Sequence, residues 1–593
     1  MAPASAVDTS AEAQVCTPSE RRCSPSDPQL VERCNANGTA WLSEVVCNAA
    51  SGQSCGPGGQ CAPACQLAAA AKGSTGCRFW AVDLDNAFVP GGTQSYYDGA
   101  NAPFAVVLSN VSASLSAEFS ITSNIGPVLL DGKSAPLDLS PIPPLGLRVL
   151  YLPARNVEGT TQDPLAYRVD TTAPVAAYQF NPLENVGVYS NDASLLLPEV
   201  ALGQDYIAMS RAQSFTILRG FLTVVATSAG TTQVQLTFGP TTLQTLGGTA
   251  KALVNGQLSE SPIASYTSNA TAYFSLLQGD VLNIETNKVG ADLTGTRVHA
   301  DHNVAVFAGS EAANAPDTIQ CNVSKCTESQ RLTGSKCGVC QGDKKTPCHS
   351  NEHCSQFLVC CADHLEMQLP AVSQWGSDHV AVKFEPRGKE GDLWRILAAQ
   401  NDTHLTFDPV PTDSLTGQPV APAVLQAGGW VEIDTRDSFE VFSAFADGTP
   451  APVMVGHFMA SQDSPGPGEQ AGDAGTGDPA FSLAVPRAQC AAYHVFSVPP
   501  KFASSWISIA GPSTANVAVD GETLPSTAWK PINSTHKFAR LPMAPGTHRV
   551  LALADPSGSS AKISVEVYGH DQYVSYAYPA GMGLVDLGLG KGK

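Results

Sequence analysis

The sequence has 593 residues, of which 43% are hydrophobic and only 15% are charged, with a net charge of −20. A chain of this length exceeds a single core, and at about 150 residues per domain it predicts roughly four units. The acidic balance argues against nucleic-acid partners and against electrostatic docking on membranes, because both surfaces are negatively charged. No apolar run of about 18 residues occurs, so we predict no membrane span.

The first residues, 1–15, are small and polar, and we predict a disordered tail there. A secretory signal has a charged segment followed by an apolar one, and these residues contain no such pattern. We infer that a signal peptide was removed from this version of the chain.

Residues 16–77 hold the first block of cysteines and little apolar periodicity. The block contains Cys16, Cys23, Cys34, Cys47, Cys55, Cys61, Cys65 and Cys77. Clustered, even sets of cysteines indicate disulfides formed in an oxidising compartment, and a unit with so small a core needs them. We predict a disulfide-rich N-terminal knot, whose pairing the spacing leaves open.

From Phe79 onward, short runs alternate apolar and polar residues between Gly, Pro, Asn, Asp and Ser, as in "FLTVVATSAGTTQVQLTF". Alternation over four to eight residues is typical of strands, and amphipathic helical patterns are nearly absent. The sequence therefore predicts an all-β chain.

An internal repeat divides this region. Four segments look like the closing strand of a unit: "APVAAYQFNP" (173–182), "HNVAVFAGSE" (302–311), "APVMVGHFMA" (451–460) and "ISVEVYGHDQ" (563–572). Three look like an opening segment that begins with Pro: "LPEVALGQDYIAMS", "LPAVSQWGSDHVAV" and "VPRAQCAAYHVFSV". A strand that follows a turn on Gly or Ala precedes the closing strand in "LLQGDVLNIET", "LQAGGWVEIDT" and "LPMAPGTHRVLAL".

The repeat predicts tandem β-sandwich-like modules of about 100 residues each. A closed ring like a β-propeller is the alternative. The predicted segments are module 1 (78–186), module 2 (187–312), a Cys-rich inserted loop (313–366), module 3 (367–462), a Gly/Pro/Asp linker (463–480), module 4 (481–584) and a tail (585–593).

The inserted loop carries the second block of cysteines. These are Cys321, Cys326, Cys337, Cys340, Cys348, Cys354, Cys360 and Cys361. We predict that they form disulfides like the first block. The alternative is a metal site, because Cys337, Cys340, His349 and His353 have the spacing C-x2-C-x8-H-x3-H, with a shorter central gap than zinc fingers have.

One cysteine remains outside both blocks. The total of 17 is odd, and Cys490 stands alone in the last module. We expect it to be unpaired or to pair with another chain.

Candidate metal ligands of another kind lie near the start of module 1. Asp83, Asp85 and Asp98 supply the hard oxygen ligands that suit Ca²⁺, but they lack the spacing of an EF-hand loop. Solvated polar groups at a strand edge are the alternative interpretation, and we otherwise expect no cofactor. His299, Asp301 and His302 in "HADH" are a further candidate set. They lie at the entry to a predicted strand, where alternate residues face opposite ways, so His302 does not share a face with His299 and Asp301. We therefore interpret them as turn residues rather than as metal ligands.

The sequence offers no set of residues that indicates a hydrolase. H-E-x-x-H does not occur, the G-x-S-x-G match "GQSCG" (52–56) lies among the cysteines of the first block, and no pair of carboxylates stands out as an acid and a base. We therefore predict that the protein is not an enzyme.

Several segments together give a family resemblance. "FWAVDLDNAF", "TGTRVHADHNVAVFAGSEAANAP", "CCADHLEMQLPAVSQWGSDHVAV" and "LQAGGWVEIDT" resemble the IgGFc-binding protein N-terminal domain family, in its bacterial secreted or surface branch, from about Phe79 to Leu584. The resemblance implies an extracellular, non-catalytic adhesion or binding module without a cofactor. No Fc-contact motif can be placed on these residues, so the resemblance does not carry that partner over.

The expected function is therefore binding outside the cytoplasm, as a secreted or cell-surface protein. We predict a protein or glycan partner at the cell surface or in the matrix. The alternative is a structural subunit of an extracellular fibre, sheath or appendage, which self-associates.

Overall fold

The structure is a computed structural model that describes most of the chain from residue 15 to residue 589. The residues outside the description are 1–14, 26, 90–97, 185–186, 255–256, 318–320, 323–325, 328, 331–332, 334, 341–344, 350–360, 415, 463, 465–475, 556–557 and 590–593. The described part is mostly β, as the sequence predicts, and α1 (Ala64–Ala71) is the α-helix whose bounds it gives.

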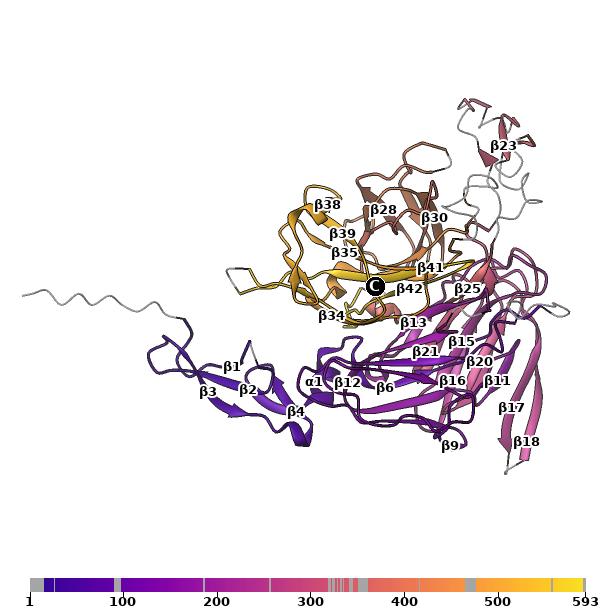
Figure 1. Cartoon of the computed structure of the whole chain (residues 1–593). Coiled ribbons are helices and arrows are strands. Elements are labelled where there is room, and N and C mark those ends of the chain that lie inside the picture. Colours follow the sequence, from indigo (N-terminus) through magenta and orange to yellow (C-terminus); the bar gives the residue numbers. More distant parts are fainter. Residues whose placement is uncertain are drawn as a thin grey trace, which may run out of the picture.

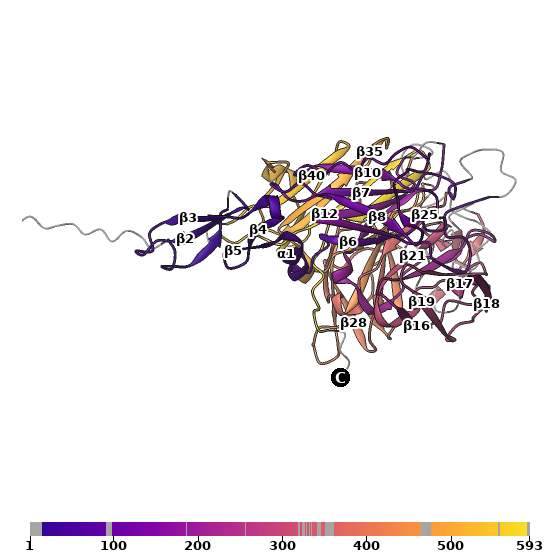
Figure 2. The same ribbon diagram turned by 90° about the horizontal axis from the view of Figure 1, so that it is seen from below.

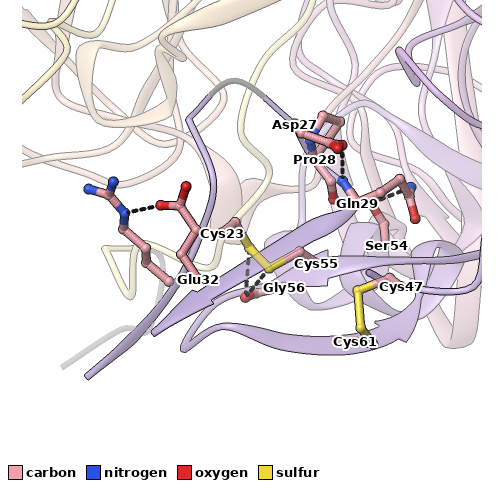
Figure 3. Close-up of a disulfide and its surroundings, with 11 residues drawn as sticks. Cys23, Asp27, Pro28, Gln29, Glu32, Cys47, Ser54, Cys55, Gly56 and Cys61 are labelled. Atoms are coloured by element: carbon pink, nitrogen blue, oxygen red, sulfur yellow. Dashed lines mark hydrogen bonds and ion pairs between the residues drawn. A yellow bond between two sulfur atoms is a disulfide. The ribbon is translucent and has the colours of Figure 1, made fainter. Parts of the chain in front are cut away.

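The N-terminal knot projects from the rest of the protein (Figure 1). It contains β1 (Arg21–Cys23), β2 (Leu30–Cys34), β3 (Trp41–Val46), η1 (Ala49–Ser51), β4 (Gln53–Gly56), β5 (Gln60–Pro63) and α1. Its disulfides are Cys16–Cys34, Cys23–Cys55, Cys47–Cys61 and Cys65–Cys77, and two of them are drawn in Figure 3. Few apolar side chains are buried here, with Val31 the main one, so sulfur bridges take the place of a core.

Four modules follow, and each contains eight strand positions. Module 1 has β6 (Gly76–Ala81), β7 (Ala105–Asn110), β8 (Phe119–Ser123), β9 (Gly126–Pro127), β10 (Leu147–Tyr151), β12 (Tyr167–Asn181) and β13 (Asp192–Leu196). Module 2 has β14 (Gly203–Ile207), β15 (Gly220–Ala226), β16 (Thr231–Thr237), β19 (Thr271–Leu277), β20 (Val281–Glu285), β21 (Arg297–Ala313) and β25 (Asp363–Gln368). The long strands β12 and β21 each fill positions 6 and 7, because their two halves pair with different neighbours.

The last two modules have a separate strand at each position. Module 3 has β26 (Asp378–Ala381), β27 (Asp392–Ala398), β28 (Thr403–Asp408), β29 (Ala423–Leu425), β30 (Trp430–Thr435), β31 (Phe439–Ala444), β32 (Val453–Phe458) and β33 (Phe481–Ala484). Module 4 has β34 (Tyr493–Val498), β35 (Ser504–Pro512), β36 (Val517–Val519), β37 (Glu522–Thr523), β39 (His536–Pro542), β40 (Gly546–Ala552), β41 (Ser564–Asp571) and β42 (Val574–Pro579).

All four modules pair these positions in the same order. One sheet has the order 1-6-3-4 and the other has the order 8-7-2-5, so that module 3 reads β26-β31-β28-β29 and β33-β32-β27-β30. A core that includes Trp394, Leu405 and Phe439 lies between these two sheets. Each module is thus a sandwich with eight strand positions, and Figure 1 shows modules 1 and 2 in one half of the molecule and modules 3 and 4 in the other.

Extra strands decorate this common plan. The hairpin β17 (Gly248–Val254) and β18 (Gln257–Ile263) joins the module 2 sheet through β11 (Thr161–Asp163), a strand that the sequence boundaries put in module 1. β38 (Lys530–Pro531) extends a sheet of module 4. The hairpin lies at the outer edge of its sheet, as Figure 2 also shows.

The repeat seen in the sequence corresponds to defined strands. The four closing segments are the position 7 strands, and the three opening segments each form a 3₁₀ turn followed by the position 1 strand: η3 (Glu199–Ala201), η5 (Val372–Gln374) and η6 (Arg487–Gln489). One alignment was wrong. The Gly turn leads into position 5 in modules 2 and 3, but the "LPMAPGTHRVLAL" turn of module 4 leads into β40 at position 6.

The position 8 strands connect the modules. β13 lies past the predicted end of module 1 and still pairs with β12, and β25 pairs with β21 across the inserted loop. The four strands β13, β25, β33 and β42 contact one another in a closed circuit. The modules are therefore arranged around a common axis, which corresponds to the closed alternative rather than to a linear row.

Asp192 lies at the centre of this circuit and is fully buried. Its carboxylate accepts hydrogen bonds from the backbone N–H groups of Glu366 in β25 (3.2 Å), Phe481 in β33 (3.0 Å) and Ala577 in β42 (3.2 Å). One side chain thus satisfies donors from all three other central strands, which would otherwise be buried without partners.

The circuit is closed by the two ends of the modular region. Ser74 donates from its backbone N–H to the carbonyl of Met582 at 2.8 Å, and Leu584 donates to the carbonyl of Lys72 at 2.6 Å. The chain before module 1 and the chain after module 4 are therefore joined by an antiparallel bridge.

The inserted loop leaves module 2 between positions 7 and 8. Its described strands are β22 (Cys321–Asn322), β23 (Gly338–Cys340) and β24 (Pro347–Cys348). Cys321 pairs with Cys348, and Cys326 pairs with Cys337. Cys340 and Cys361 are also disulfide-bonded, whereas Cys354 and Cys360 lie outside the described residues. Buried cysteines form the loop's own small core.

Candidate functional site

A hollow opens at one end of the axis, where the four central strands begin. The residues just before these strands line it: Ser190 before β13, Ala362 before β25, Asp478 before β33 and Tyr573 before β42. The four strands run in the same direction around the axis, so their starts gather at one end. At the other end, Pro486 and Gln489 of η6 pack with Met582 and Leu584, and almost no space remains.

We call this feature the axial hollow. Its volume is about 560 Å³, and it is lined by Ala87, Val89, Tyr189, Ser190, Phe215, Leu218, Ala312, Cys361, Ala362, Gln462, Asp478 and Tyr573. The size lies in the range of ligand sites, about 300–1,000 Å³. The mix of many apolar groups with few polar ones is also typical of such sites. Two exposed apolar side chains adjoin it in the sequence, Phe88 and Ile217, which are 49% and 48% exposed.

Two aromatic rings form one wall of the axial hollow. Tyr189 and Tyr573 meet edge to face, with ring centroids 4.9 Å apart. Tyr573 has a φ of 58°, in the left-handed region that bulky residues rarely adopt. Such conformations cost free energy and concentrate at functional positions. The tight turn between β41 and β42 imposes this conformation and holds the ring at the hollow.

The polar groups of the axial hollow are tied to the backbone around it. Asp478 accepts hydrogen bonds from the backbone N–H groups of Cys361 (3.2 Å) and Gln462 (3.1 Å). The Ser190 hydroxyl donates to Asn86 Oδ1 at 2.6 Å. These groups are oriented by their partners, and none forms the hydrogen-bonded nucleophile and base of a hydrolase.

The three aspartates proposed as Ca²⁺ ligands do not form one site. Asp83 is buried and accepts from the Arg155 N–H at 3.0 Å, and burial raises its pKa to about 7. Asp98 instead accepts from the N–H and the side-chain amide of Asn101. Within the part of the chain that the structure describes, Asp85 alone of the three joins a group of acidic side chains, and its partners, Glu285 and Glu311, come from module 2.

The zinc alternative is wrong for the pair of cysteines that it requires. Cys337 is bonded to Cys326, and Cys340 is also in a disulfide, so neither offers the thiolate that zinc binds. His353 lies outside the described residues. Every described cysteine of the two blocks is in a disulfide.

The prediction that the residues of "HADH" form a turn is wrong, because they lie within the long strand β21. His299 contacts Asp205 at 2.7 Å, and His302 contacts Asp301 at 2.9 Å. All four side chains are exposed, and no ion-binding group in the described part of the chain includes them.

Cys490 is the free cysteine among the described residues. Its residue is partly exposed, but the thiol packs against the apolar core and contacts the carbonyl of Pro486. Burial raises the pKa of this thiol to about 12. A thiol reacts through its thiolate, so Cys490 is poorly suited to link chains.

We expect Cys490 to react slowly with a disulfide reagent such as Ellman's reagent in the folded protein at pH 8. The rate should keep rising with pH up to pH 10, since the folded-state pKa lies above that range. In denaturant, the same thiol should titrate near its ordinary value and react about tenfold or more faster. A rapid reaction in the folded state, or dimers on a non-reducing gel that the Cys490→Ser variant lacks, would contradict this expectation.

Sequence reasoning did not find the axial hollow. Its residues come from the end of β21 and from six connections between strands, spread from Ala87 to Tyr573, and none carries a recognisable motif. One signal was present: an Asp stands six to eight residues before the Pro in "DASLLLP", "DHLEMQLP" and "DPAFSLAVP". These are Asp192, Asp363 and Asp478, which all bond across the axis or beside it.

The fold and the site define a class: an all-β protein of four repeated sandwiches around a closed axis, with disulfide-stabilised additions and a hollow at the junction of the modules. Comparison with known families agrees with this class. The model of the family described as IgGFc binding protein matches residues 192–329 and 322–569. Because these matches cover more than half of the chain, the chain belongs to that family.

The matched region begins at Asp192, the first residue of β13. Module 1 lies almost wholly before it and still has the same strand order as the matched modules. The expected resemblance from Phe79 is thus supported by sequence from Asp192 on, and by topology alone before it.

The other comparisons add little. No curated protein matches the chain. Among solved structures, an anti-sigma factor domain-containing protein is 9% identical over 34% of this chain and 81% of its own, with a TM-score of 0.11, which is too low to support an argument. None of the helices in the described part of the chain has the length and apolar character needed to cross a bilayer.

Proposed function

We propose that the protein is an extracellular, non-catalytic binding protein whose axial hollow accepts an apolar side chain of a partner protein. The observation that carries the proposal is the hollow itself: about 560 Å³, lined from all four modules and bordered by Tyr189 and Tyr573. Buried aromatic pockets at the centre of a contact supply most of the affinity in protein complexes.

Two features support a location outside the cytoplasm. All described cysteines of the two blocks are in disulfides, and disulfides persist in secreted and surface proteins. The family description also indicates protein binding, although no Fc-contacting residue can be named in this chain.

The lining favours a protein over a glycan partner. Phe215, Leu218 and the alanines present apolar surface, and the exposed Phe88 and Ile217 stand nearby. A sugar would need several hydroxyl partners, whereas the polar groups here already bond to one another or to the backbone. An aliphatic or aromatic side chain gains more from this surface.

The test uses the full chain and a variant that leaves the fold intact. Tyr573→Asn removes the ring but keeps a residue that tolerates a positive φ, so we expect normal stability. A phage-displayed peptide library and the purified IgG Fc fragment are the protein probes, and a glycan array is the comparison. We expect selected peptides to carry an apolar anchor and to bind Tyr573→Asn at least about tenfold more weakly.

The matched control is Tyr273→Asn. Tyr273 is 74% exposed on β19, away from the axial hollow, and its loss should leave binding unchanged. Equal binding to wild type and Tyr573→Asn, or binding to glycans alone, would overturn the proposal. If the protein forms ladders or filaments in solution and the selected peptides do not disrupt them, the structural-subunit alternative is favoured.

A further inference from the structure

Three carboxylates meet behind the wall of the axial hollow. Asp85 comes from module 1, just after β6, while Glu285 ends β20 and Glu311 lies in β21 of module 2. One carboxylate oxygen of each lies within 4.8 Å of the others. Glu311 lies opposite Arg219, and Glu285 pairs with Phe221, two residues further along the same segment. Because alternate residues of a strand share a face, Glu311 and Glu285 lie on the same face of their sheet.

The contacts that hold these side chains leave an acceptor free. Asp85 accepts from the Gly159 N–H at 2.7 Å, and Glu311 accepts from the Arg219 N–H at 3.0 Å. Glu285 is 1% exposed and faces the Arg219 guanidinium with Oε2 at 3.5 Å. Its Oε1 is buried and accepts from no N–H or hydroxyl group of the described residues, while the neighbouring Asp85 carboxyl can bond to Glu285 only if a proton lies between the two. An ionised, unpartnered oxygen at this depth is costly unless it binds something.

The charges around the cluster do not balance. Three carboxylates face one guanidinium, that of Arg219, which leaves two negative charges if all are ionised. Glu158 adds to the negative potential at Asp85 and Glu311. Either protons or a doubly charged cation must therefore neutralise the cluster.

We propose that Asp85, Glu285 and Glu311 bind one divalent cation of the Ca²⁺ type and that this ion joins module 1 to module 2. Ca²⁺ takes oxygen ligands at about 2.3–2.6 Å, so two ligand atoms across the ion lie up to about 5 Å apart, which agrees with the observed spacing. Carboxylates can bind in bidentate fashion, and carbonyls and water complete the shell. Asp85 and Glu311 are 6% and 7% exposed, so the cluster is not sealed from solvent.

The experiment measures the ion directly in the full chain. Protein dialysed against EDTA is titrated with CaCl₂ at pH 7.5 by calorimetry, and its thermal unfolding is followed with and without Ca²⁺. We expect one ion per chain, with a dissociation constant in the millimolar range or tighter, and a higher Tm with Ca²⁺. Mg²⁺ should bind more weakly, since it dehydrates reluctantly.

Variants separate the cluster from other acidic groups. Glu285→Gln should weaken Ca²⁺ binding at least about tenfold and remove the Tm rise, whereas Asp98→Asn should behave as wild type. Glu311→Gln serves if Glu285→Gln fails to fold, because its amide oxygen can still accept from Arg219. Two results would overturn the proposal. The first is that wild type takes up no Ca²⁺ and that Glu285→Gln has a higher Tm than wild type without metal. The second is that Ca²⁺ uptake survives both Glu285→Gln and Glu311→Gln.

Discussion

Replacing Asp192 with alanine is expected to cost more stability than any other single change of a polar residue that we consider. The substitution leaves the N–H groups of Glu366, Phe481 and Ala577 buried without an acceptor. Each unsatisfied donor costs about 1–3 kcal/mol, so we expect a loss on the order of 4 kcal/mol or more. Denaturant unfolding measures the loss, and hydrogen exchange should show faster exchange at these three amides.

Asp192→Asn is the informative intermediate. Both carboxylate oxygens accept, Oδ2 from Glu366 and Phe481 and Oδ1 from Ala577, and an amide can replace only one of them. We expect a smaller loss, about half as large. Asp205→Ala is the control, since Asp205 is exposed and its loss should stay within about 0.5 kcal/mol. Unchanged exchange in β25, β33 and β42 after Asp192→Ala would contradict the role of this carboxylate.

Reduction of the disulfides is expected to unfold the N-terminal knot while the four modules stay folded. The knot has four bridges, two of which are drawn in Figure 3, and few buried apolar residues, and each bridge contributes about 2–4 kcal/mol. The modules instead have continuous apolar cores. Cys490 is the one cysteine within their described strands and turns that is not oxidised.

Hydrogen exchange with and without a reductant such as TCEP checks this prediction. Amides of β1 to β5 should lose protection, whereas those of β27 and β32 should keep it. The Cys490→Ser variant should behave the same, which shows that the effect arises from the bridges. Persistent protection of the knot after complete reduction, verified by mass, would show that its small sheets hold without sulfur.

The repeat could be predicted because it is written in local patterns. The closing segments contain the apolar runs of β32 and β41, and Pro begins each opening segment before its 3₁₀ turn. Cysteine clustering likewise predicted both disulfide regions. The wrong alignment of the Gly turn in module 4 shows the limit: one turn signal occurs before strand position 5 in two modules and before position 6 in another, and local sequence does not distinguish them.

The candidate sites could be predicted only in part. Asp85 was recognised as a possible oxygen ligand, but its partners Glu285 and Glu311 are about 200 residues away. Each of them resembles an ordinary strand residue, and their proximity depends on the register of β20 and β21 against the chain after β6. Cys490 was recognised as odd, and its burial was not visible in the sequence.

By itself the sequence determined the strands, the repeated unit and the two oxidised cysteine blocks, because alternation, turn residues and cysteine spacing act over a few neighbouring positions. Only the tertiary structure decided that the position 8 strands meet around one axis, that Asp192 bonds to all of them and that a hollow opens where they begin. Those features depend on contacts between modules, whose free energy comes from burying groups that are hundreds of residues apart.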